Sequence, residues 1–140
     1  KSDMPQQGVF YDGQIYDAYT FVADLLRSAK SRIILIDNYI DDTVLTLLNK
    51  RENNVSATIY TDRISRNLQL DIERHNTQYP IITVRTYRMG HDRFLIIDDK
   101  IYHIGASIKD LGKKLFGFSL MHELSVSELL NRIDMRLIND

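Results

Sequence analysis

The segment HDRFLIIDDKIYHIGAS, residues 91–107, has two runs of mostly apolar residues on either side of the polar sequence DDK. Branched and aromatic side chains favour β-strands, whereas Asp and Lys at the centre are typical of a tight turn. The pattern therefore predicts a β-hairpin with RFLIID and IYHIGA as its two strands. Polar and basic residues at the ends make this hairpin a candidate binding site as well as a structural element.

Helical and strand patterns alternate on both sides of the hairpin. RIILID has four consecutive branched apolar residues, which suits a strand covered on both faces. Ser125 and Glu128 form a capping-box pattern that opens a last amphipathic segment. The sequence predicts helices at residues 15–29, 41–50, 64–75 and 125–137, and further strands at residues 32–37, 55–60, 81–84 and 117–120.

This order of elements is that of an α/β domain with a mixed central sheet flanked by helices on both faces. A chain of 140 residues with 44% hydrophobic side chains is long enough for one core but not for two. We expect residues 14–140 to form this single domain. Residues 1–13 contain Pro5, Gly8 and Gly13, and are predicted to be a tail or linker that leads into the fold.

The composition argues against several other classes of protein. The chain has no cysteine, so we expect no disulfides or thiolate metal site and a cytoplasmic location. No apolar run approaches the ~18 residues of a membrane span, and no signal-peptide pattern opens the chain. His75, His103 and His122 lack the spacing of a metal site, and no nucleotide-binding glycine loop is present. We therefore expect no metal, no cofactor and no membrane partner.

The charges are unevenly distributed, although the formal net charge is only −1. Residues 85–114 hold seven Lys or Arg against four Asp or Glu, a local charge of +3, whereas residues 1–84 and 115–140 each sum to −2. The net charge argues against a protein that coats nucleic acid through bulk electrostatics. The local excess fits an anion site at the hairpin, but charge alone favours chance scatter on a solvated surface.

Polar residues gather at one end of the predicted hairpin. If residues 91–97 are extended, the two-residue period of a strand places His91 and Arg93 on the same face. The returning strand brings Gly105, Ser107 and Lys109 back to that end, where they offer an unobstructed backbone, a hydroxyl and a cation. These residues together predict an anion pocket.

Simpler interpretations exist for each of these side chains. A histidine at the end of a strand is more often a surface residue than a nucleophile, and Arg93 could pair with Asp92 or Asp98. Asp98 has the opposite parity to His91, so we expect it to lie at the turn in a supporting role. Spacing alone leaves a binding site as the minority interpretation.

One motif of the hairpin resembles that of a known superfamily. HDRFLIID resembles the HxKxxxxD signature of the phospholipase D superfamily, with His91 and Asp98 in register and Arg93 in the place of the lysine. Upstream, YDAYTFVADLLRSAKSRIILIDNYI resembles the opening helix and first strand of that superfamily. The resemblance implies a phospholipase D-like fold over most of the chain.

A following segment departs from the superfamily pattern at two positions. Residues 105–108 stand where the superfamily often has GSxN, and Gly105 matches, whereas Ala106 and Ile108 replace the serine and the asparagine. More closely, DGQIYDAYTFV, IDNYIDD and HDRFLIIDD with HIGASIKDLGKK resemble the C-terminal region of certain bacterial proteins. Those proteins carry a phage-antirepressor-type DNA-binding domain at their N terminus. Because the chain begins at Lys1 without a methionine, we expect it to be a fragment that such a domain precedes.

The resemblance implies metal-independent phosphodiester cleavage, in which one histidine attacks phosphorus and a second protonates the leaving group. His91 would be the nucleophile and form a phosphohistidine intermediate, since a neutral imidazole can attack and its phosphoramidate is labile. Arg93 would bind the phosphate and stabilise charge on its oxygens. Asp98 would support the site, and Glu123, which corresponds loosely to a later acidic residue of the superfamily, would orient a histidine.

The sequence has a single copy of the motif, yet the implied reaction needs two histidines. Single-motif members of the superfamily pair two identical chains around a two-fold axis, which implies a homodimer with two His91 side chains facing each other. His103 is a poor substitute within one chain. Two functions therefore remain open. The first is a homodimeric phosphodiesterase, of nuclease type, that acts on nucleic acid. The second is a degenerate module of a DNA-binding protein that keeps the fold for phosphate binding or dimerisation.

Overall fold

The computed structural model describes residues 4–139, and the side chains of residues 4–137. Within this range, helices and strands alternate much as the sequence patterns predict. The elements are β1 (Gln7–Phe10), α1 (Ile15–Ser28), β2 (Arg32–Ile36), α2 (Asp42–Leu48), β3 (Ser56–Thr61), α3 (Arg66–Gln78), β4 (Ile82–Thr86), β5 (Arg93–Ile97), β6 (Lys100–Ile104), the short 3-10 helix η1 (Ile108–Asp110), β7 (Phe116–Leu120) and α4 (Val126–Asn139).

The described strands form one mixed sheet in the order β1-β7-β6-β5-β2-β3-β4. β2, β3 and β4 are parallel, because α2 and α3 return the chain to the same end of the sheet between them. β5 then runs antiparallel to β2, and the hairpin and β7 continue antiparallel out to β1 at the edge. The junction between the parallel and antiparallel halves therefore lies between β2 and β5.

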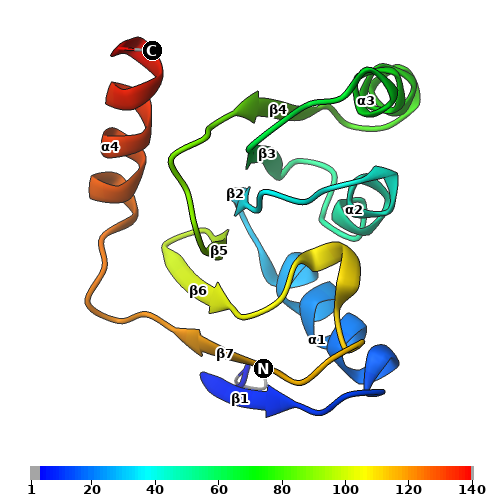
Figure 1. Ribbon diagram of the computed structural model, residues 1–140, viewed down its shortest axis with the longest axis vertical. Helices are drawn as coiled ribbons and strands as arrows, with labels where there is room; N and C mark the ends of the chain where they lie inside the picture. The colour runs from blue at the N-terminus through cyan, green and yellow to red at the C-terminus, as the bar shows by residue number, and fades with distance from the viewer. Residues whose placement is uncertain (1–3, 140) are drawn as a thin grey trace.

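Helices cover both faces of this sheet, as Figure 1 shows, with α1, α2 and α3 on one side and α4 alone on the other. Alternate residues of β2 enter the two cores: Ile33 and Leu35 pack with α1, whereas Ile34 and Ile36 pack on the side of α4. Burial on both faces explains why the strand is apolar at every position. The predicted fold class, an α/β domain with a mixed sheet and helices on both faces, is confirmed.

Side chains cap several helices where the sequence offers acceptors. The Asp41 carboxylate accepts a hydrogen bond from the Thr43 backbone N–H, and the Ser65 hydroxyl accepts one from Leu68. At α4, the Glu128 N–H donates to the Ser125 hydroxyl at 3.3 Å. These contacts satisfy amide groups that have no partner inside the helix.

The N-terminal segment differs from the tail or linker that the sequence predicts. Gln7–Phe10 forms β1, which pairs with β7, while residues 1–3 lie outside the described part of the chain. Phe10 anchors the strand, since its ring lies 5.5 Å from that of Phe116 and 5.7 Å from that of Phe118. Pro5 and the glycines suggested a connector, but this aromatic contact draws the segment into the sheet.

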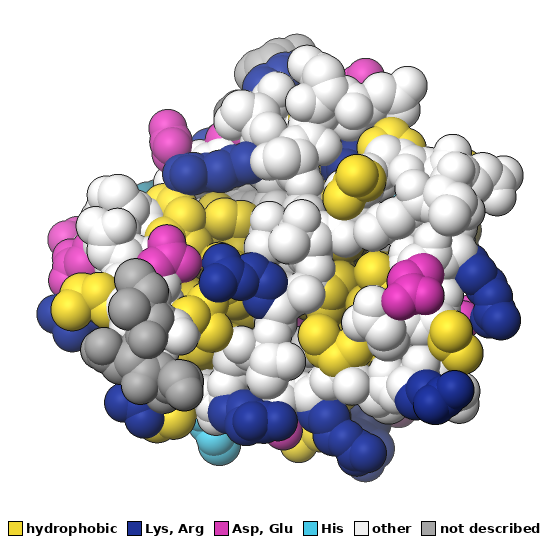
Figure 2. Space-filling view, turned by 90° about the horizontal axis from the view of Figure 1, so that it is seen from above, with side chains coloured by type: hydrophobic (Ala, Val, Ile, Leu, Met, Phe, Trp, Pro, Cys, Tyr) yellow, Lys and Arg dark blue, Asp and Glu magenta, His cyan; other side chains and the backbone are white. Residues whose placement is uncertain are grey.

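The surface in Figure 2, seen from above the end of α4 and the edge strand β4, mixes hydrophobic and charged side chains. Lys and Arg side chains lie along one rim of this view, with Asp and Glu scattered between hydrophobic groups. Among the described residues, none of the helices combines the length and the apolar character needed to cross a membrane.

Candidate anion site at the junction of the two half-sheets

Three polar side chains lie in a row where β2 and β3 end and β5 begins. The pairing of β2 with both neighbours places Asp37, the residue after β2, between Thr61 of β3 and Arg93 of β5. All three have the strand parity that faces α1, α2 and α3. Ligand sites of open α/β sheets commonly lie at the carboxyl ends of strands where the strand order changes, and this row occupies such a place.

Asp37 is the most buried charged residue of the row, with no solvent-exposed surface. Its carboxylate accepts hydrogen bonds from the Ser107 hydroxyl at 3.0 Å, the Ile108 N–H at 2.8 Å and the Tyr39 N–H at 3.1 Å. Burial raises the pKa of Asp37 above its ordinary value, although these hydrogen bonds and the charge of Arg93 act in the opposite direction. Asp37 thus ties the loops after β2 and β6 together beside Arg93.

Arg93 reaches from the start of β5 to the end of β6. Its Nη2 donates to the Gly105 carbonyl at 3.0 Å, whereas its Nε is buried and has no hydrogen-bond partner among the described residues. Gly105 suits this place because a Cβ there would lie 2.8 Å from the carbonyl oxygen of Gly117 in β7. The structure therefore brings Arg93 and Gly105 together and leaves a guanidinium donor without a protein acceptor.

His91 lies outside the strand, so the condition for a shared strand face of His91 and Arg93, an extended segment from residue 91, is not met. β5 begins only at Arg93, and His91 is exposed in the preceding loop. The loop is held by Asn38, whose side-chain amide donates to the Gly90 carbonyl at 2.9 Å. Among the described residues, His91 forms no hydrogen bond, so its ring is free to meet a ligand two residues before Arg93.

Asp92, a possible ion-pair partner of Arg93 by sequence, pairs with a histidine instead. Asp92 lies 3.1 Å from the Nε2 of His103. His103 is opposite Phe94 on β6, which puts its ring on the sheet face that Arg93 does not use. His103 is therefore not placed to act beside Arg93.

Ser107 and Lys109, both predicted phosphate ligands, are engaged with protein groups. The Ser107 hydroxyl is buried and donates to Asp37. The Nζ of Lys109 lies 2.7 Å from Asp110, which also pairs with Lys113 at 3.0 Å. The hydrogen bond to Asp110 raises the pKa of Lys109, burial opposes it, and the charges of Asp110 and of more distant carboxylates add to the rise. Only a rearrangement would free the Ser107 hydroxyl for phosphate.

Asp98 lies at the opposite end of the hairpin, about 16 Å along β5 from Arg93 at the usual rise of a strand. It adopts a left-handed conformation (φ 55°) in the turn to β6. Its carboxylate accepts from the backbone N–H groups of Lys30, Ser31 and Arg32 and from the Ser31 hydroxyl, at 2.8–3.2 Å. Burial opposes ionisation, but these hydrogen bonds outweigh it and lower the pKa of Asp98 to about 2.

Glu123 also lies at this far end of the hairpin. β7 runs antiparallel to β6, and the Met121 N–H donates to the Ile101 carbonyl, so the chain after β7 follows the turn between β5 and β6. Glu123 is exposed there. The structure thus does not bring Glu123 or Asp98 to His91 and Arg93, because each lies beyond a five-residue strand.

Asp37 is the residue of this site that the sequence analysis missed. The patterns identified RIILID as a buried strand, but the acidic side chain that ends it was assigned no role. The signal available was the parity of Asp37, which matches that of Ile33 and Leu35 on a strand buried on both faces. A carboxylate that follows such a strand on a core-facing parity must find buried donors or a cation.

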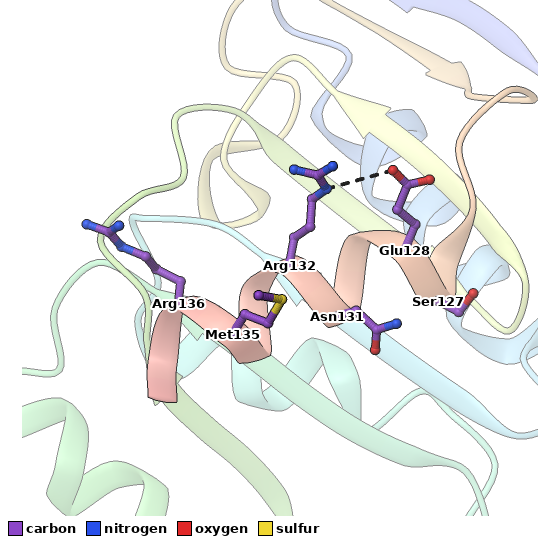
Figure 3. Close-up of a pocket in the computed structure, with 6 residues that line it drawn as sticks. All are labelled: Ser127, Glu128, Asn131, Arg132, Met135 and Arg136. Carbon is purple, nitrogen blue, oxygen red and sulfur yellow. Dashed lines mark ion pairs between the residues drawn. The ribbon is translucent and has the colours of Figure 1, made fainter. Parts of the chain in front are cut away.

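A hollow of about 630 Å³ lies along the outer surface of α4, which covers the sheet face opposite to that of Asp37 and Arg93. It is lined by residues of this helix alone: Ser127, Glu128, Asn131, Arg132, Met135 and Arg136. Figure 3 shows these side chains projecting from one helix, with Arg132 directed toward Glu128 at 3.7 Å. None of the predicted site residues borders it. In the described part of the chain, no group of three His, Asp or Glu side chains is arranged to hold a metal ion.

Known structures share this fold, although no family model and no curated protein matches the sequence. NucT from Helicobacter pylori, a phospholipase D-family nuclease, is 11% identical with a TM-score of 0.60, over 94% of this chain and 92% of NucT. Phosphatidylserine synthase from Haemophilus influenzae Rd KW20 is 19% identical with a TM-score of 0.62, over 92% of this chain and 36% of the synthase.

A third structure is that of TrmBL2, an archaeal chromatin protein described as showing a novel mode of DNA binding. It is 12% identical with a TM-score of 0.58, over 99% of this chain and 55% of TrmBL2. The chain thus spans about half of the TrmBL2 chain and about a third of the synthase. The likenesses show that the fold of this protein is phospholipase D-like.

Proposed function

We propose that the chain is a phospholipase D-like phosphodiesterase domain of nuclease type, which binds the phosphate of a nucleic acid at Arg93. The observation that carries the proposal is the guanidinium of Arg93, whose buried Nε has no protein acceptor, two residues after the exposed His91. A guanidinium binds phosphate oxygens well because its donors lie in one plane. The likeness of the fold to NucT supports this choice of substrate.

In the proposed reaction, a nitrogen of His91 attacks phosphorus and the bond to the leaving oxygen breaks. A second, protonated histidine gives its proton to that oxygen, and Arg93 stabilises the charge on the non-bridging oxygens. Water then attacks the phosphohistidine, loses a proton to the second histidine, and releases a phosphomonoester and free His91. The net change is hydrolysis of one ester bond.

A second copy of the chain supplies the second histidine in this proposal. His103 of the same chain lies on the other sheet face and is engaged with Asp92, so it is not placed for this role. The exposed position of His91 allows two copies to meet around a two-fold axis with their His91 rings together. We propose that Asp98 supports this arrangement indirectly by fixing the hairpin, and that Glu123 has no contact with the substrate.

The second candidate function is a phosphate-binding or dimerisation module without catalysis, within a DNA-binding protein. The observation that favours it is the hydrogen bond of the Ser107 hydroxyl to Asp37, which removes one expected phosphate ligand. Ala106 and Ile108, which replace polar residues of the superfamily motif, point the same way. TrmBL2, a chromatin protein with the same fold, is a precedent for a role in DNA binding.

Hydrolysis of an aryl phosphodiester and of single- and double-stranded DNA, in excess chelator, tests the first proposal. We expect activity in the wild type and none in His91→Ala, whereas His122→Ala should remain active because His122 lies beyond β7 and contacts Gln6. Arg93→Lys should retain or increase the rate, since it restores the superfamily residue. If the wild type and Arg93→Lys are as inactive as His91→Ala on all substrates, the non-catalytic module is the correct function.

A further inference from the structure

We propose that Asp37 is a fixed counter-ion of Arg93 that determines the charge of the phosphate accepted by the site, favouring a singly charged phosphodiester over a doubly charged phosphomonoester. The inference rests on the proposed function, because it requires that phosphate binds at Arg93. It assigns a specificity role to a residue outside the HxKxxxxD-type motif.

Asp37 and Arg93 lie close together but form hydrogen bonds with other groups. The Asp37 carboxylate accepts hydrogen bonds from Ser107, Ile108 and Tyr39, and the Arg93 guanidinium donates to the Gly105 carbonyl. The two groups nevertheless lie on neighbouring strands and face the same side, and the charge of Arg93 acts on the carboxylate. Arg93 is therefore electrically compensated, while its partly exposed guanidinium keeps donors that form no hydrogen bond with the described residues, beside the buried and unpaired Nε.

The other charged groups near Asp37 leave no surplus of positive charge. Lys109 is the nearby cation of η1, and both it and Lys113 pair with Asp110. Asp41, the cap of α2, adds a further carboxylate that acts on Lys109. Lys109 and Lys113 thus share Asp110, and neither is left without a carboxylate partner.

The buried Asp37 carboxylate offsets the charge of Arg93, so a second negative charge on a ligand adds little to its binding. A phosphodiester carries one negative charge, whereas a phosphomonoester carries about 1.5 to 2 near pH 7. The attraction of the extra charge to Arg93 is offset by its repulsion from Asp37, and burial of the carboxylate limits screening by salt. A dianion therefore gains little over a monoanion at this site, in contrast to an uncompensated arginine.

Two small anions, dimethyl phosphate and methyl phosphate, test the inference as models of the diester and the monoester. Titrations of the isotopically labelled chain at pH 8 and constant ionic strength would follow the Arg93 Nε–H resonance by NMR. In the wild type, we expect dimethyl phosphate to bind at least as tightly as methyl phosphate. Asp37→Asn should increase the affinity for methyl phosphate, relative to dimethyl phosphate, by about tenfold.

Ser107→Ala is the matched control, because it removes one hydrogen bond to the carboxylate but keeps the charge. It should lose stability, as Asp37→Asn does, yet keep the wild-type preference between the two anions. A thermal melt of each variant shows whether it folds. If Asp37→Asn does not fold, the relative affinity of the wild type for the two anions tests the role of Asp37. Methyl phosphate that binds the wild type tenfold or more tightly than dimethyl phosphate would overturn that role.

The outcomes separate this inference from the proposed function. If both anions shift the Arg93 resonance and Asp37→Asn leaves their relative affinity unchanged, Asp37 does not set the charge preference, while phosphate binding at Arg93 stands. If neither anion shifts the resonance in the wild type or in Asp37→Asn, the proposed function fails and the inference fails with it.

Discussion

Asp37 and Asp98 accept hydrogen bonds from several donors each, yet their pKa values move in opposite directions. Asp37 is fully buried, and the cost of burying its charge exceeds the effect of its three donors and of Arg93. Asp98 lies at a partly open turn, where three backbone amides and a hydroxyl outweigh its burial. Hydrogen bonds from backbone amides act to lower the pKa of both carboxylates, but the net shift is downward only at Asp98, where burial is modest.

Asp98→Asn tests the structural role of the turn. The pKa of Asp98 in the folded chain is about 2, below its ordinary value of 3.8, so its contribution to stability is present above pH 4 and is lost as the pH falls toward 2. The variant should lower the free energy of unfolding by about 1–2 kcal/mol at pH 7. Chemical denaturation from pH 7 to pH 2 should show the free energies of unfolding of the wild type and the variant converging in acid.

Asp99→Asn is the control, at a neighbouring side chain that is 99% exposed, and should change the free energy of unfolding little at any pH. A constant difference between the wild type and Asp98→Asn across this range would contradict the account.

At the scale of elements, periodicity and turn residues predicted α1 to α4, the hairpin and the fold class. They failed where long-range contacts decide the structure. β1 forms because Phe10 packs on the aromatic side chains of β7 and α1, which no local pattern in its own segment indicates. β5 starts at Arg93, as the hairpin pattern indicates, but His91 lies in a loop before the strand, where Asn38, distant in sequence, binds the carbonyl of Gly90. For the same reason the strand parity of His91 could not be predicted from the sequence.

Gly105→Ala tests how closely β6 must approach β7. The new Cβ would lie 2.8 Å from the Gly117 carbonyl oxygen, which itself accepts the Gly105 N–H, so the strands would have to separate. We expect a loss of about 1–3 kcal/mol in the free energy of unfolding. The hydrogen bond from Arg93 to the Gly105 carbonyl should also weaken.

Gly117→Ala is the control on the facing strand, because its Cβ would meet the nearest atom at 3.5 Å, an ordinary contact. It should change the free energy of unfolding by less than about 0.5 kcal/mol. Equal melting temperatures for the two variants in differential scanning calorimetry would show that the approach of β6 to β7 does not require glycine at residue 105.

For the whole molecule, the proposed reaction with two histidines requires two copies to assemble, because the sequence has a single copy of the motif. We expect a dimer at micromolar concentration in light scattering after size exclusion, with His91→Ala also dimeric because one exposed side chain is a small part of a protein–protein interface. A monomer at high micromolar concentration would remove the two-histidine mechanism for this chain.

Binding of nucleic acid should be weak and salt-dependent, because the formal net charge is −1 and the contacts proposed fall on phosphate. Titrations with DNA of several sequences should give similar affinities that fall as salt increases. Arg93→Gln should weaken binding to all sequences alike. Tight, sequence-selective binding that survives about 0.5 M salt would contradict the account of a phosphate contact.

Detection of the covalent intermediate would show whether His91 is the nucleophile. The wild-type chain is mixed with an aryl phosphodiester in excess chelator, quenched in alkali, where a phosphohistidine persists, and digested for mass spectrometry. We predict an acid-labile phosphoryl ester adduct on His91 that forms in the wild type and in His122→Ala but not in His91→Ala. Release of the aryl alcohol without any adduct on His91, or an adduct that persists in His91→Ala, would contradict the proposal that His91 is the nucleophile.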